Sequence, residues 1–221
     1  MLLQHQCSWG RAMKVPIIGI KRLCMDTDGE GVTTLVAFYG CTLNCNYCLN
    51  PHSKELLYPI KWYTEETLYR EVKIDYLYFQ ATGGGLTFGG GEPLLHIDFI
   101  NSMKKQYGQD ICFNAETALH IEWDLIKRST KAIDHYIVDC KSMDNNIYKR
   151  YTGQDNGRMR ENLARLIEQV GNERLTVKLP IIPGYQEEGQ LGYSKEQLAA
   201  IGITDIRTFP YTTQIDKVKR E

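Results

Sequence analysis

Three cysteines, Cys41, Cys45 and Cys48, are spaced as C-x3-C-x2-C. Thiolates this close in sequence can bind one metal centre and leave a fourth coordination position open for a substrate or cofactor. A structural zinc site uses four protein ligands, and Cys24 or His52 would have to complete the set here. An iron–sulfur cluster held by three cysteines needs no fourth protein ligand. The spacing therefore favours an iron–sulfur cluster, with zinc as the alternative.

A glycine-rich stretch, residues 82–93, is the second candidate for chemistry. It contains two glycine triplets and ends in Gly90, Gly91, Glu92 and a proline. Glycines after a strand let a ligand approach the backbone closely, and consecutive N–H groups can bind a polar group. The phosphate-binding pattern GxxxxGK[ST] is absent. The alternative without function is a flexible hairpin. We expect instead that this stretch binds a ligand, and that Glu92 binds a cationic group such as an amine.

Three weaker candidates follow apolar runs or adjoin the cysteines. Glu116-Thr117 and Asp139-x-Lys141 each come directly after a predicted strand. Carboxylates at such positions are usually solvated or cap helices, but two oxygen-rich strand ends on one rim could hold a hard cation or a polar substrate. Tyr47, next to the third cysteine, is most often a packing aromatic, and beside a cluster it could stack on a flat heterocycle. Each of the five histidines is expected to be structural.

The elements that must position these residues alternate along the chain. Apolar, β-branched or aromatic runs predict six strands, with amphipathic helical patterns between them. Each candidate residue lies where a strand gives way to a loop, which is where sites are built in parallel barrels. The segments are too few for an eight-fold barrel, so we expect an α/β fold, a partial (β/α)6 TIM-like barrel with parallel strands. The predicted strands are residues 33–39, 86–88, 111–115, 135–138, 175–179 and 205–209.

Composition narrows the class of protein. The chain has 221 residues, 43% of them hydrophobic, and a formal net charge of -1, which gives no electrostatic footprint for nucleic acid or an anionic membrane. No apolar run approaches the ~20 residues of a membrane helix. Seven cysteines without a signal-peptide pattern predict a reducing cytoplasm rather than a disulfide framework. We expect residues 1–14 to be an extension, with Met13 as a candidate start, and residues 15–221 to form a single domain.

Taken together, the motifs resemble the radical S-adenosylmethionine (SAM) superfamily. Within it the chain is similar to the glycyl-radical-enzyme activating enzymes, the group that includes the pyruvate formate-lyase activating enzyme, in a short form without a ferredoxin-like insert. The resemblance covers residues 17–211. It is carried by Asp28-Gly29-Glu30-Gly31, the stretch from Cys41 to Asn50, residues 83–93, Glu116-Thr117, residues 139–144, Thr152-Gly153 and residues 180–184.

The resemblance implies a set of cofactor contacts. A [4Fe–4S] cluster would be held by the three cysteines, and its open iron would bind SAM. Gly90, Gly91 and Glu92 would contact the SAM amino group and Lys141 its carboxylate. The remaining implied contacts are a monovalent cation beside SAM, at Asp139, Glu116 and Thr117, and further cofactor contacts from Tyr47 and Lys178.

The resemblance also implies a reaction. The reduced cluster would cleave SAM to methionine and a 5′-deoxyadenosyl radical, which would abstract a hydrogen from a glycine of a partner glycyl radical enzyme in an anaerobic cytoplasm. A flavodoxin or ferredoxin would supply the electron. The chain departs from the family pattern at three positions: Glu116 stands where Asp is usual, Lys178 where Arg is common, and Thr212 where a His is frequent.

Two other functions compete with this interpretation. One is small-molecule radical SAM chemistry of the 7-carboxy-7-deazaguanine synthase type, although residues 139–144 and 179–184 match the activating enzymes better. The other is a non-catalytic zinc-binding interaction domain. Metal content separates the zinc domain from both enzyme functions.

Overall fold

A single eight-stranded sheet forms the centre of the molecule. The computed structural model describes residues 13–25, 28–54, 60–186 and 188–211. The strand order is β3-β1-β2-β4-β5-β6-β7-β8, and the strands from β2 to β8 pair in parallel. All six predicted parallel strands are thus confirmed, in an unclosed sheet. They are β2 (Val32–Phe38), β4 (Gly85–Gly90), β5 (Cys112–Thr117), β6 (His135–Asp139), β7 (Leu175–Ile181) and β8 (Ile206–Pro210).

Two antiparallel strands extend this parallel core and were not predicted. β1 (Val15–Met25) pairs with β2 and with β3 (Lys61–Tyr63). The register of β1 against β2 shifts twice, and Leu23 has a positive φ of 54°. These irregularities break the alternation of apolar and polar residues by which a strand is recognised in sequence.

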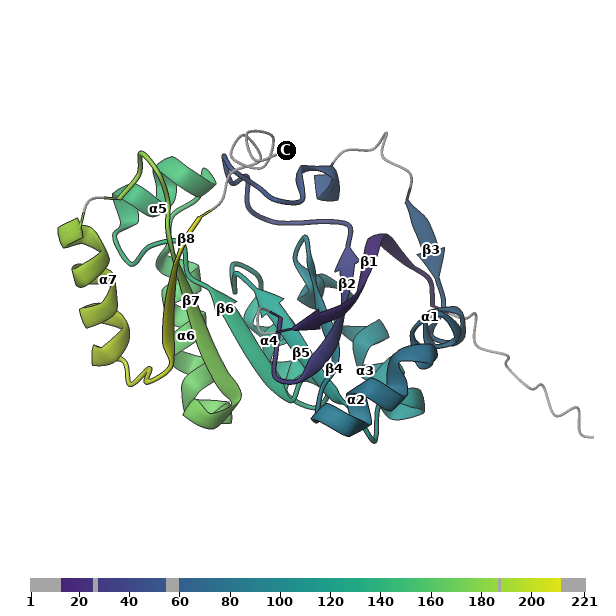
Figure 1. The fold of residues 1–221 in the computed structure, drawn as a ribbon. Coiled ribbons are helices and arrows are strands. Elements are labelled where there is room, and N and C mark those ends of the chain that lie inside the picture. The colour runs from purple at the N-terminus through teal and green to yellow at the C-terminus, as the bar shows by residue number, and fades with distance from the viewer. Residues whose placement is uncertain (1–12, 26–27, 55–59, 187, 212–221) are drawn as a thin grey trace, which may run out of the picture.

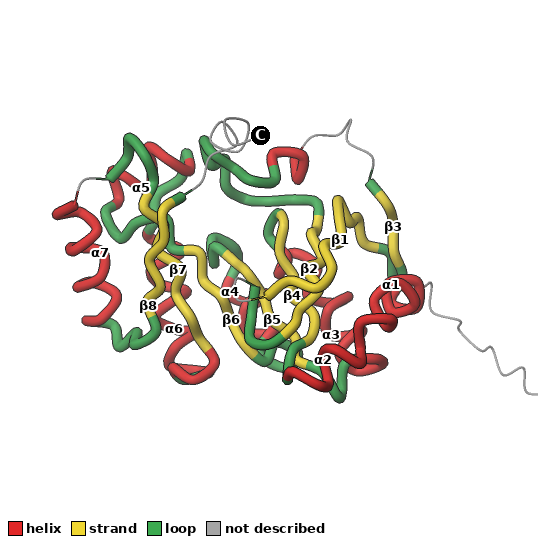
Figure 2. Tube along the Cα trace, viewed as in Figure 1, coloured by secondary structure: helices red, strands yellow, loops and turns green. Residues whose placement is uncertain are grey.

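The helices lie outside the curved sheet (Figures 1 and 2). Neighbours α1, α3, α4 and α6 contact one another in a row. Short 3₁₀ turns at Pro51–Lys54, Lys73–Asp75, Pro93–His96 and Asn172–Arg174 connect the longer elements. The helices are α1 (Glu65–Val72), α2 (Tyr76–Thr82), α3 (Ile97–Tyr107), α4 (Trp123–Ser129), α5 (Asn145–Thr152), α6 (Gly157–Val170) and α7 (Glu188–Ala200).

The α5 helix was not predicted, although its ends carry clear signals. The Asp144 side chain accepts hydrogen bonds from the N–H groups of Asn146 (2.8 Å) and Ile147 (3.1 Å), which satisfies donors that a helix start leaves free. Gly153 ends the helix in the left-handed conformation at φ 78°. The intervening residues are mostly polar, so a hydrophobic stripe gives little indication of a helix here.

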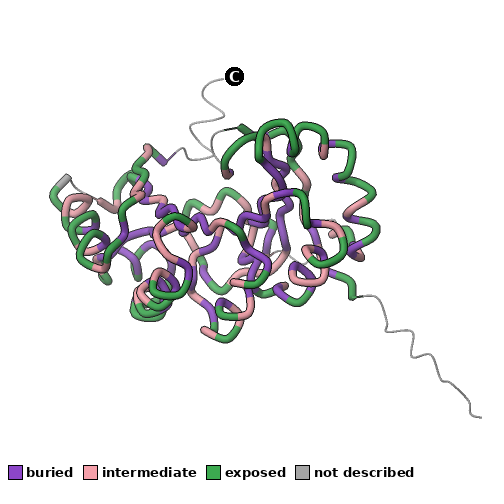
Figure 3. Tube along the Cα trace, turned by 90° about the horizontal axis from the view of Figure 1, so that it is seen from below, coloured by how far each residue is buried: buried purple, intermediate pink, exposed green. Residues whose placement is uncertain are grey.

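The core lies between the sheet and this outer row of helices. Figure 3 shows the buried residues along the strands, with exposed residues on the outer helix surfaces. Phe38, Phe88 and Phe113, on three adjacent strands, are fully buried, with centroid separations of 5.9 and 5.0 Å between successive rings. Phe38 also contacts Phe99 of α3, so this face of the sheet packs on the helices. The opposite face is left for the site.

Some expectations fall on other parts of the chain. Thr212 and most of the predicted N-terminal extension lie outside the described residues, and the domain limits stay a prediction. In the part that is described, no helix combines the length and the apolar character needed to cross a membrane.

Candidate functional site

A cavity of about 690 Å³ lies inside the curve of the sheet. All the predicted site residues line it except Tyr47 and Glu92. The three cysteines therefore share one space with both strand-end motifs, as the rim argument predicts. The predicted residues that line it are Cys41, Cys45, Cys48, Gly90, Gly91, Glu116, Thr117, Asp139, Lys141 and Lys178.

Alternation along the strands explains which side chains reach the cavity. Successive strand residues point to opposite faces, and His135, Ile137 and Asp139 of β6 all line the cavity. In the parallel register Asp139 pairs with Lys178, as Glu116 does with Ile137. Register thus stacks charged residues of β5, β6 and β7 on one face of the sheet.

The cysteines lie on a loop, residues 41–50, that backbone contacts fix in place. The N–H groups of Asn44 and Asn46 donate to the carbonyls of Thr152 (2.9 Å) and Tyr151 (3.0 Å) at the end of α5. On the other side Asn50 Nδ2 donates to the carbonyl of Gly90 (3.2 Å). The cysteine loop is thereby attached both to the glycine-rich strand end and to α5.

The three thiols suit a cluster that takes one thiolate on each of three irons. They are free, half-buried and close enough to influence one another's ionisation. Among the described residues, no three His, Cys, Asp or Glu side chains are grouped to hold a single metal ion. Cluster ligands need only surround a shared space, since each binds a different iron. The donor set, three thiolates facing one cavity, therefore fits a [4Fe–4S] cluster with an open iron.

Burial raises the pKa of Cys41, and it raises the pKa of Cys45 to about 11, against the opposing effect of the Lys141 ammonium. A thiol that coordinates a metal is deprotonated outright. Binding of a cluster at this loop would therefore release protons and be favoured by higher pH.

Lys141 and Asp139 form an ion pair beside the thiols. The Lys141 Nζ donates to Asp139 Oδ2, and only 8% of the lysine side chain is exposed. Burial alone would lower the pKa of Lys141. The negative charges of Asp139 and Cys45 raise it by more than burial lowers it, so the pKa lies above its ordinary value and the ammonium stays charged at neutral pH. Its Nζ also lies 6.0 Å from the centroid of the Tyr211 ring. The cavity thus holds a fixed positive charge next to Cys45.

Glu116 and Lys178 form a second ion pair on the cavity wall. Lys178 Nζ donates to Glu116 Oε1 at 2.7 Å and lies 4.0 Å from Asp28 Oδ1. Burial raises the pKa of Glu116, and the Lys178 ammonium opposes this. The carboxylate that the resemblance assigns to a monovalent cation already has a cationic partner from the chain itself.

Glu92 does not line the cavity. Its carboxylate accepts hydrogen bonds from the Thr117 hydroxyl (2.8 and 2.9 Å) and from the N–H groups of Ala118 (3.1 Å) and Leu94 (3.2 Å). It thereby joins the end of β4 to the end of β5. Burial raises the pKa of Glu92 to about 7 even though these hydrogen bonds favour the charged form. The predicted contact of Glu92 with an amine stays a prediction, and the observed role of its side chain is structural.

Tyr47 also lies outside the cavity lining. Its ring packs edge-on against Tyr151 (6.1 Å) and Tyr185 (5.8 Å), and the Tyr211 hydroxyl donates to its carbonyl at 2.6 Å. The packing interpretation of Tyr47 agrees with these contacts, and stacking on a heterocycle stays a prediction.

The glycines serve close strand packing as well as the cavity. A Cβ on Gly84 would lie 1.9 Å from the Val32 carbonyl oxygen, and one on Gly91 would lie 2.0 Å from that of Gly40. These distances are far inside van der Waals contact, so only glycine fits without moving the backbone. We predicted close approach by a ligand; at these positions the approaching group is a neighbouring segment of the chain.

Several cavity residues were missed in the sequence. His135 and Thr176 lie near the amino ends of β6 and β7, and the two side chains are hydrogen-bonded at 2.9 Å. Arg207, near the amino end of β8, pairs with Asp205 at 2.9 Å. Two-residue spacing could have found this set, since His135 lies two and four residues before Ile137 and Asp139. The rim argument concerns only the carboxyl ends of the strands, so it does not reach these residues.

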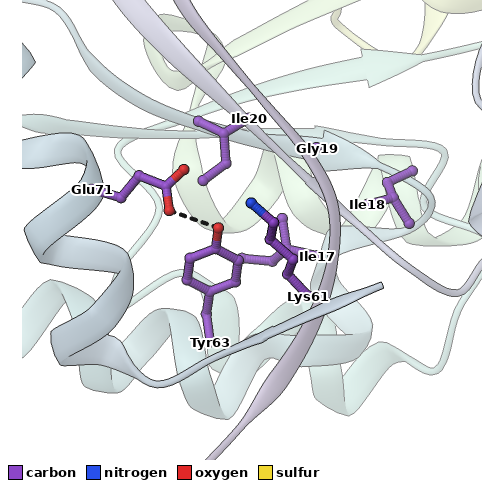
Figure 4. A pocket seen from close by; sticks show the side chains of 7 residues that line it. All are labelled: Ile17, Ile18, Gly19, Ile20, Lys61, Tyr63 and Glu71. Atoms are coloured by element: carbon purple, nitrogen blue, oxygen red, sulfur yellow. Dashed lines mark hydrogen bonds between the residues drawn. The ribbon is translucent and has the colours of Figure 1, made fainter. Parts of the chain in front are cut away.

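A smaller cavity of about 220 Å³ shares no lining residue with the main one (Figure 4). The Tyr63 hydroxyl donates to Glu71 Oε2 across it at 2.6 Å. No cysteine and no predicted site residue lines this cavity. Its lining residues are Ile17, Ile18, Gly19, Ile20, Lys61, Tyr63 and Glu71.

Comparison with known proteins agrees with the geometry. Residues 35–190 match the family model of the radical SAM superfamily. The chain is 29% identical over 168 residues to a pyruvate formate-lyase-activating enzyme of Staphylococcus aureus strain USA300. That match covers 73% of this chain and 66% of the relative, so the chain matches just under two thirds of the relative's length.

Solved structures share the architecture. A domain of a pyruvate-formate lyase-activating enzyme from Bacteroides vulgatus superposes with a TM-score of 0.51 at 27% identity, covering 62% of this chain and 89% of that one. Streptococcus suis SuiB bound to S-adenosylmethionine superposes with a TM-score of 0.60 at 14% identity, covering 80% and 39%. The second likeness concerns the fold alone. Both support the unclosed parallel sheet as a partial barrel.

Proposed function

Because the chain belongs to the radical SAM superfamily, we propose that it is an activase that generates a glycyl radical on a partner enzyme. One observation carries the proposal: the three free cysteines open onto the same cavity as the ion pairs of Lys141 with Asp139 and of Lys178 with Glu116. A thiolate-bound cluster and a charged amino acid cofactor need such adjoining surfaces. The similarity to pyruvate formate-lyase-activating enzymes supports the choice of protein substrate.

The chain's own residues would hold the two cofactors. Cys41, Cys45 and Cys48 would ligate the cluster, and the buried Lys141 ammonium would attract the SAM carboxylate. The backbone of Gly90 and Gly91 would meet the SAM amino group at the end of β4. When bound and reduced, the cluster with SAM supplies methionine and a 5′-deoxyadenosyl radical, which is the hard chemistry of the reaction.

The cavity wall would orient the bound group and keep its charges balanced. Asp139 holds Lys141, and Lys178 neutralises Glu116, so neither carboxylate faces the cavity alone. Cavity walls that exclude water strengthen such interactions and protect a reactive radical. We propose that Lys178 stands in for the monovalent cation beside SAM that the resemblance implies.

The substrate would enter from the amino ends of the strands. Glu30 and Arg207 line the cavity there and are exposed, whereas the cysteine loop covers the opposite end. A glycine-bearing segment of the partner could approach through this opening. A small polar molecule could also meet these charges, which keeps chemistry of the 7-carboxy-7-deazaguanine synthase type as the second candidate.

Detection of 5′-deoxyadenosine by chromatography tests the proposal. We expect anaerobically reconstituted protein to contain iron and sulfide and, with dithionite and SAM, to form 5′-deoxyadenosine. A partner glycyl radical enzyme should increase the yield, whereas candidate deazaguanine precursors should not. Protein that carries one zinc and no iron would contradict both enzyme functions and favour the zinc-binding domain. The cytoplasmic location remains part of the proposal.

A further inference from the structure

The hydroxyl of Tyr148, on α5, has no hydrogen-bond partner among the residues that the structure describes. The side chain is fully buried. A buried hydroxyl that has given up water without gaining another partner destabilises a fold, so nearly all such groups are paired. An unpaired one calls for a physical reason, and a role in redox chemistry is one of those known for such groups.

Two other buried tyrosines show that this fold can satisfy a phenol. The Tyr136 hydroxyl is hydrogen-bonded to the Ser129 hydroxyl at 2.6 Å, and Tyr63 donates to Glu71 Oε2 at 2.6 Å. Tyr136 is as fully buried as Tyr148. Burial alone therefore does not account for the unpaired hydroxyl of Tyr148.

The last turn of α5 holds the middle cysteine of the loop. The N–H groups of the residues on either side of Cys45 donate to the carbonyls of Thr152 (2.9 Å) and Tyr151 (3.0 Å). Tyr148 lies one turn earlier, and its carbonyl accepts a hydrogen bond from the Thr152 hydroxyl at 2.8 Å. Cys45 also packs against the hydrophobic core to which Tyr148 belongs. The core side of Cys45 is therefore supported by the helix that carries Tyr148.

The Tyr148 hydroxyl also lies within electrostatic range of Cys45. Burial raises the pKa of Tyr148, negative charge on Cys140 or Cys45 would raise it further, and the Lys141 ammonium lowers it. The phenol stays protonated at neutral pH, and a protonated phenol has one O–H to donate. A negatively charged sulfur is a stronger acceptor for such a donor than a neutral one.

Of the two cysteines near this hydroxyl, only Cys45 lines the cavity. Burial raises the pKa of Cys140 to about 12, so its sulfur stays a neutral thiol, which is a weak acceptor. A cysteine that binds iron is deprotonated and carries negative charge instead. This difference favours Cys45 as the acceptor once a cluster is bound.

We propose that Tyr148 is a positioning residue for the cluster, and that its hydroxyl donates a hydrogen bond to the Cys45 thiolate. The inference rests on the proposed function, because it is the bound cluster that gives Cys45 its negative charge. Hydrogen bonds to the sulfurs are among the features that set the reduction potential of an iron–sulfur cluster. A donor at this position stabilises the reduced form, which carries one more negative charge, and so makes the one-electron reduction easier.

A potentiometric titration followed by electron paramagnetic resonance tests the inference on cluster-loaded protein. We expect Tyr148→Phe to shift the reduction equilibrium about three- to tenfold toward the oxidised cluster, a fall in midpoint potential of at most about 59 mV. The iron content and the melting temperature should stay unchanged, because the hydroxyl has no partner among the described residues to lose.

The matched control is Tyr136→Phe, which removes a buried hydroxyl that is paired with Ser129. Tyr136 lies on the face of β6 opposite the cavity, since it alternates with His135 and Ile137, which line the cavity. This variant should have a lower melting temperature and an unchanged potential. Incorporation of 3-fluorotyrosine at position 148 keeps the shape of the side chain and makes the O–H a stronger donor, so it should raise the potential. That replacement decides the question if Tyr148→Phe takes up no cluster.

An unchanged midpoint potential in the variants at position 148 would overturn the inference. A lower melting temperature in Tyr148→Phe without a change in potential would do the same, because it would show that the hydroxyl serves the fold alone. Wild-type protein that binds no iron and sulfide would instead contradict the proposed function itself.

Discussion

At the scale of single residues, surroundings separate cysteines that look alike in sequence. Cys41, Cys45 and Cys48 line the cavity. Cys140 lies between Asp139 and Lys141, yet alternation turns it away from the cavity into the core, where it is fully buried. Spacing alone singles out the first three as candidate ligands. The direction of Glu92 could not be predicted, because it depends on Thr117 and Ala118 of another strand.

Alanine substitution of the cysteines tests this division. Cys41→Ala, Cys45→Ala or Cys48→Ala should each abolish SAM cleavage, because a cluster ligand is lost, as measured by the yield of 5′-deoxyadenosine and the iron content. Cys112→Ala and Cys140→Ala should keep both. Loss of the cluster in Cys140→Ala would show that the ligand assignment is wrong.

Removal of the Lys178 ammonium should leave the half-enclosed Glu116 carboxylate without its partner. We expect Lys178→Met to lower the free energy of unfolding by about 1–3 kcal/mol and to weaken SAM binding, measured by denaturant titration and calorimetry. Lys178→Arg, which keeps the charge, should lose much less. Wild-type activity should not require added potassium. A strict potassium requirement would show that Lys178 does not replace the cation.

At the scale of elements, the sequence pattern predicts the six parallel strands but not the elements β1 and α2 that pack beside them. β1 and α2 are joined through Asp75, which is fully buried. The carboxylate accepts from Arg22 and, at 2.9 Å, from the Thr34 hydroxyl. These three residues are far apart in sequence, so no local pattern predicts them. The α2 helix is only seven residues long and carries exposed Leu77 and Tyr78, which obscures its periodicity.

Replacement of Asp75 should weaken this attachment in a pH-dependent way. Its hydrogen bond with Arg22 lowers the pKa of Asp75 below the ordinary value of 3.8. The folded state thus holds the proton less tightly than the unfolded one, so the pair stabilises the fold at neutral pH and loses this effect as the pH falls below about 4. Asp75→Asn should lower the free energy of unfolding by about 1–3 kcal/mol at pH 7.

Chemical denaturation at a series of pH values measures this effect. The gap between wild type and Asp75→Asn should narrow toward acid, whereas an exposed control, Asp124→Asn in the first turn of α4, should show little difference from wild type. A gap that stays constant down to about pH 4 and below would contradict the role given to the ion pair.

Addition of one methyl group at Gly91 should disrupt the end of β4. The new Cβ would lie 2.0 Å from the Gly40 carbonyl oxygen, a backbone atom that cannot move alone. We expect Gly91→Ala to lower the melting temperature and the iron content together, because the same shift would displace the start of the cysteine loop. Gly157→Ala, where nothing lies within 4 Å of the new Cβ, is the matched control. Equal melting temperatures for the two variants would contradict the close-packing role.

At the scale of the whole molecule, the number of predicted strands indicates an open barrel. The sheet is indeed open: in the residues described, β3 and β8 are its two unpaired edges. The cavity extends along the strands from the cysteine loop to charged residues at their amino ends. The argument that sites form at the carboxyl ends of parallel strands predicts the end of the cavity at the cysteine loop. It does not predict the end at the amino ends of the strands, because that end depends on which face of the sheet curves inward. On the proposed function, the first end would hold the cofactors and the other would admit a substrate.

Electron paramagnetic resonance of a partner glycyl radical enzyme tests the central claim most directly. Reduced, cluster-loaded protein should produce a glycine-centred doublet on the partner when SAM is present, and Cys45→Ala should produce none. If SAM is cleaved but no partner, including those whose genes lie beside that of this chain, shows the doublet, the protein is not an activase.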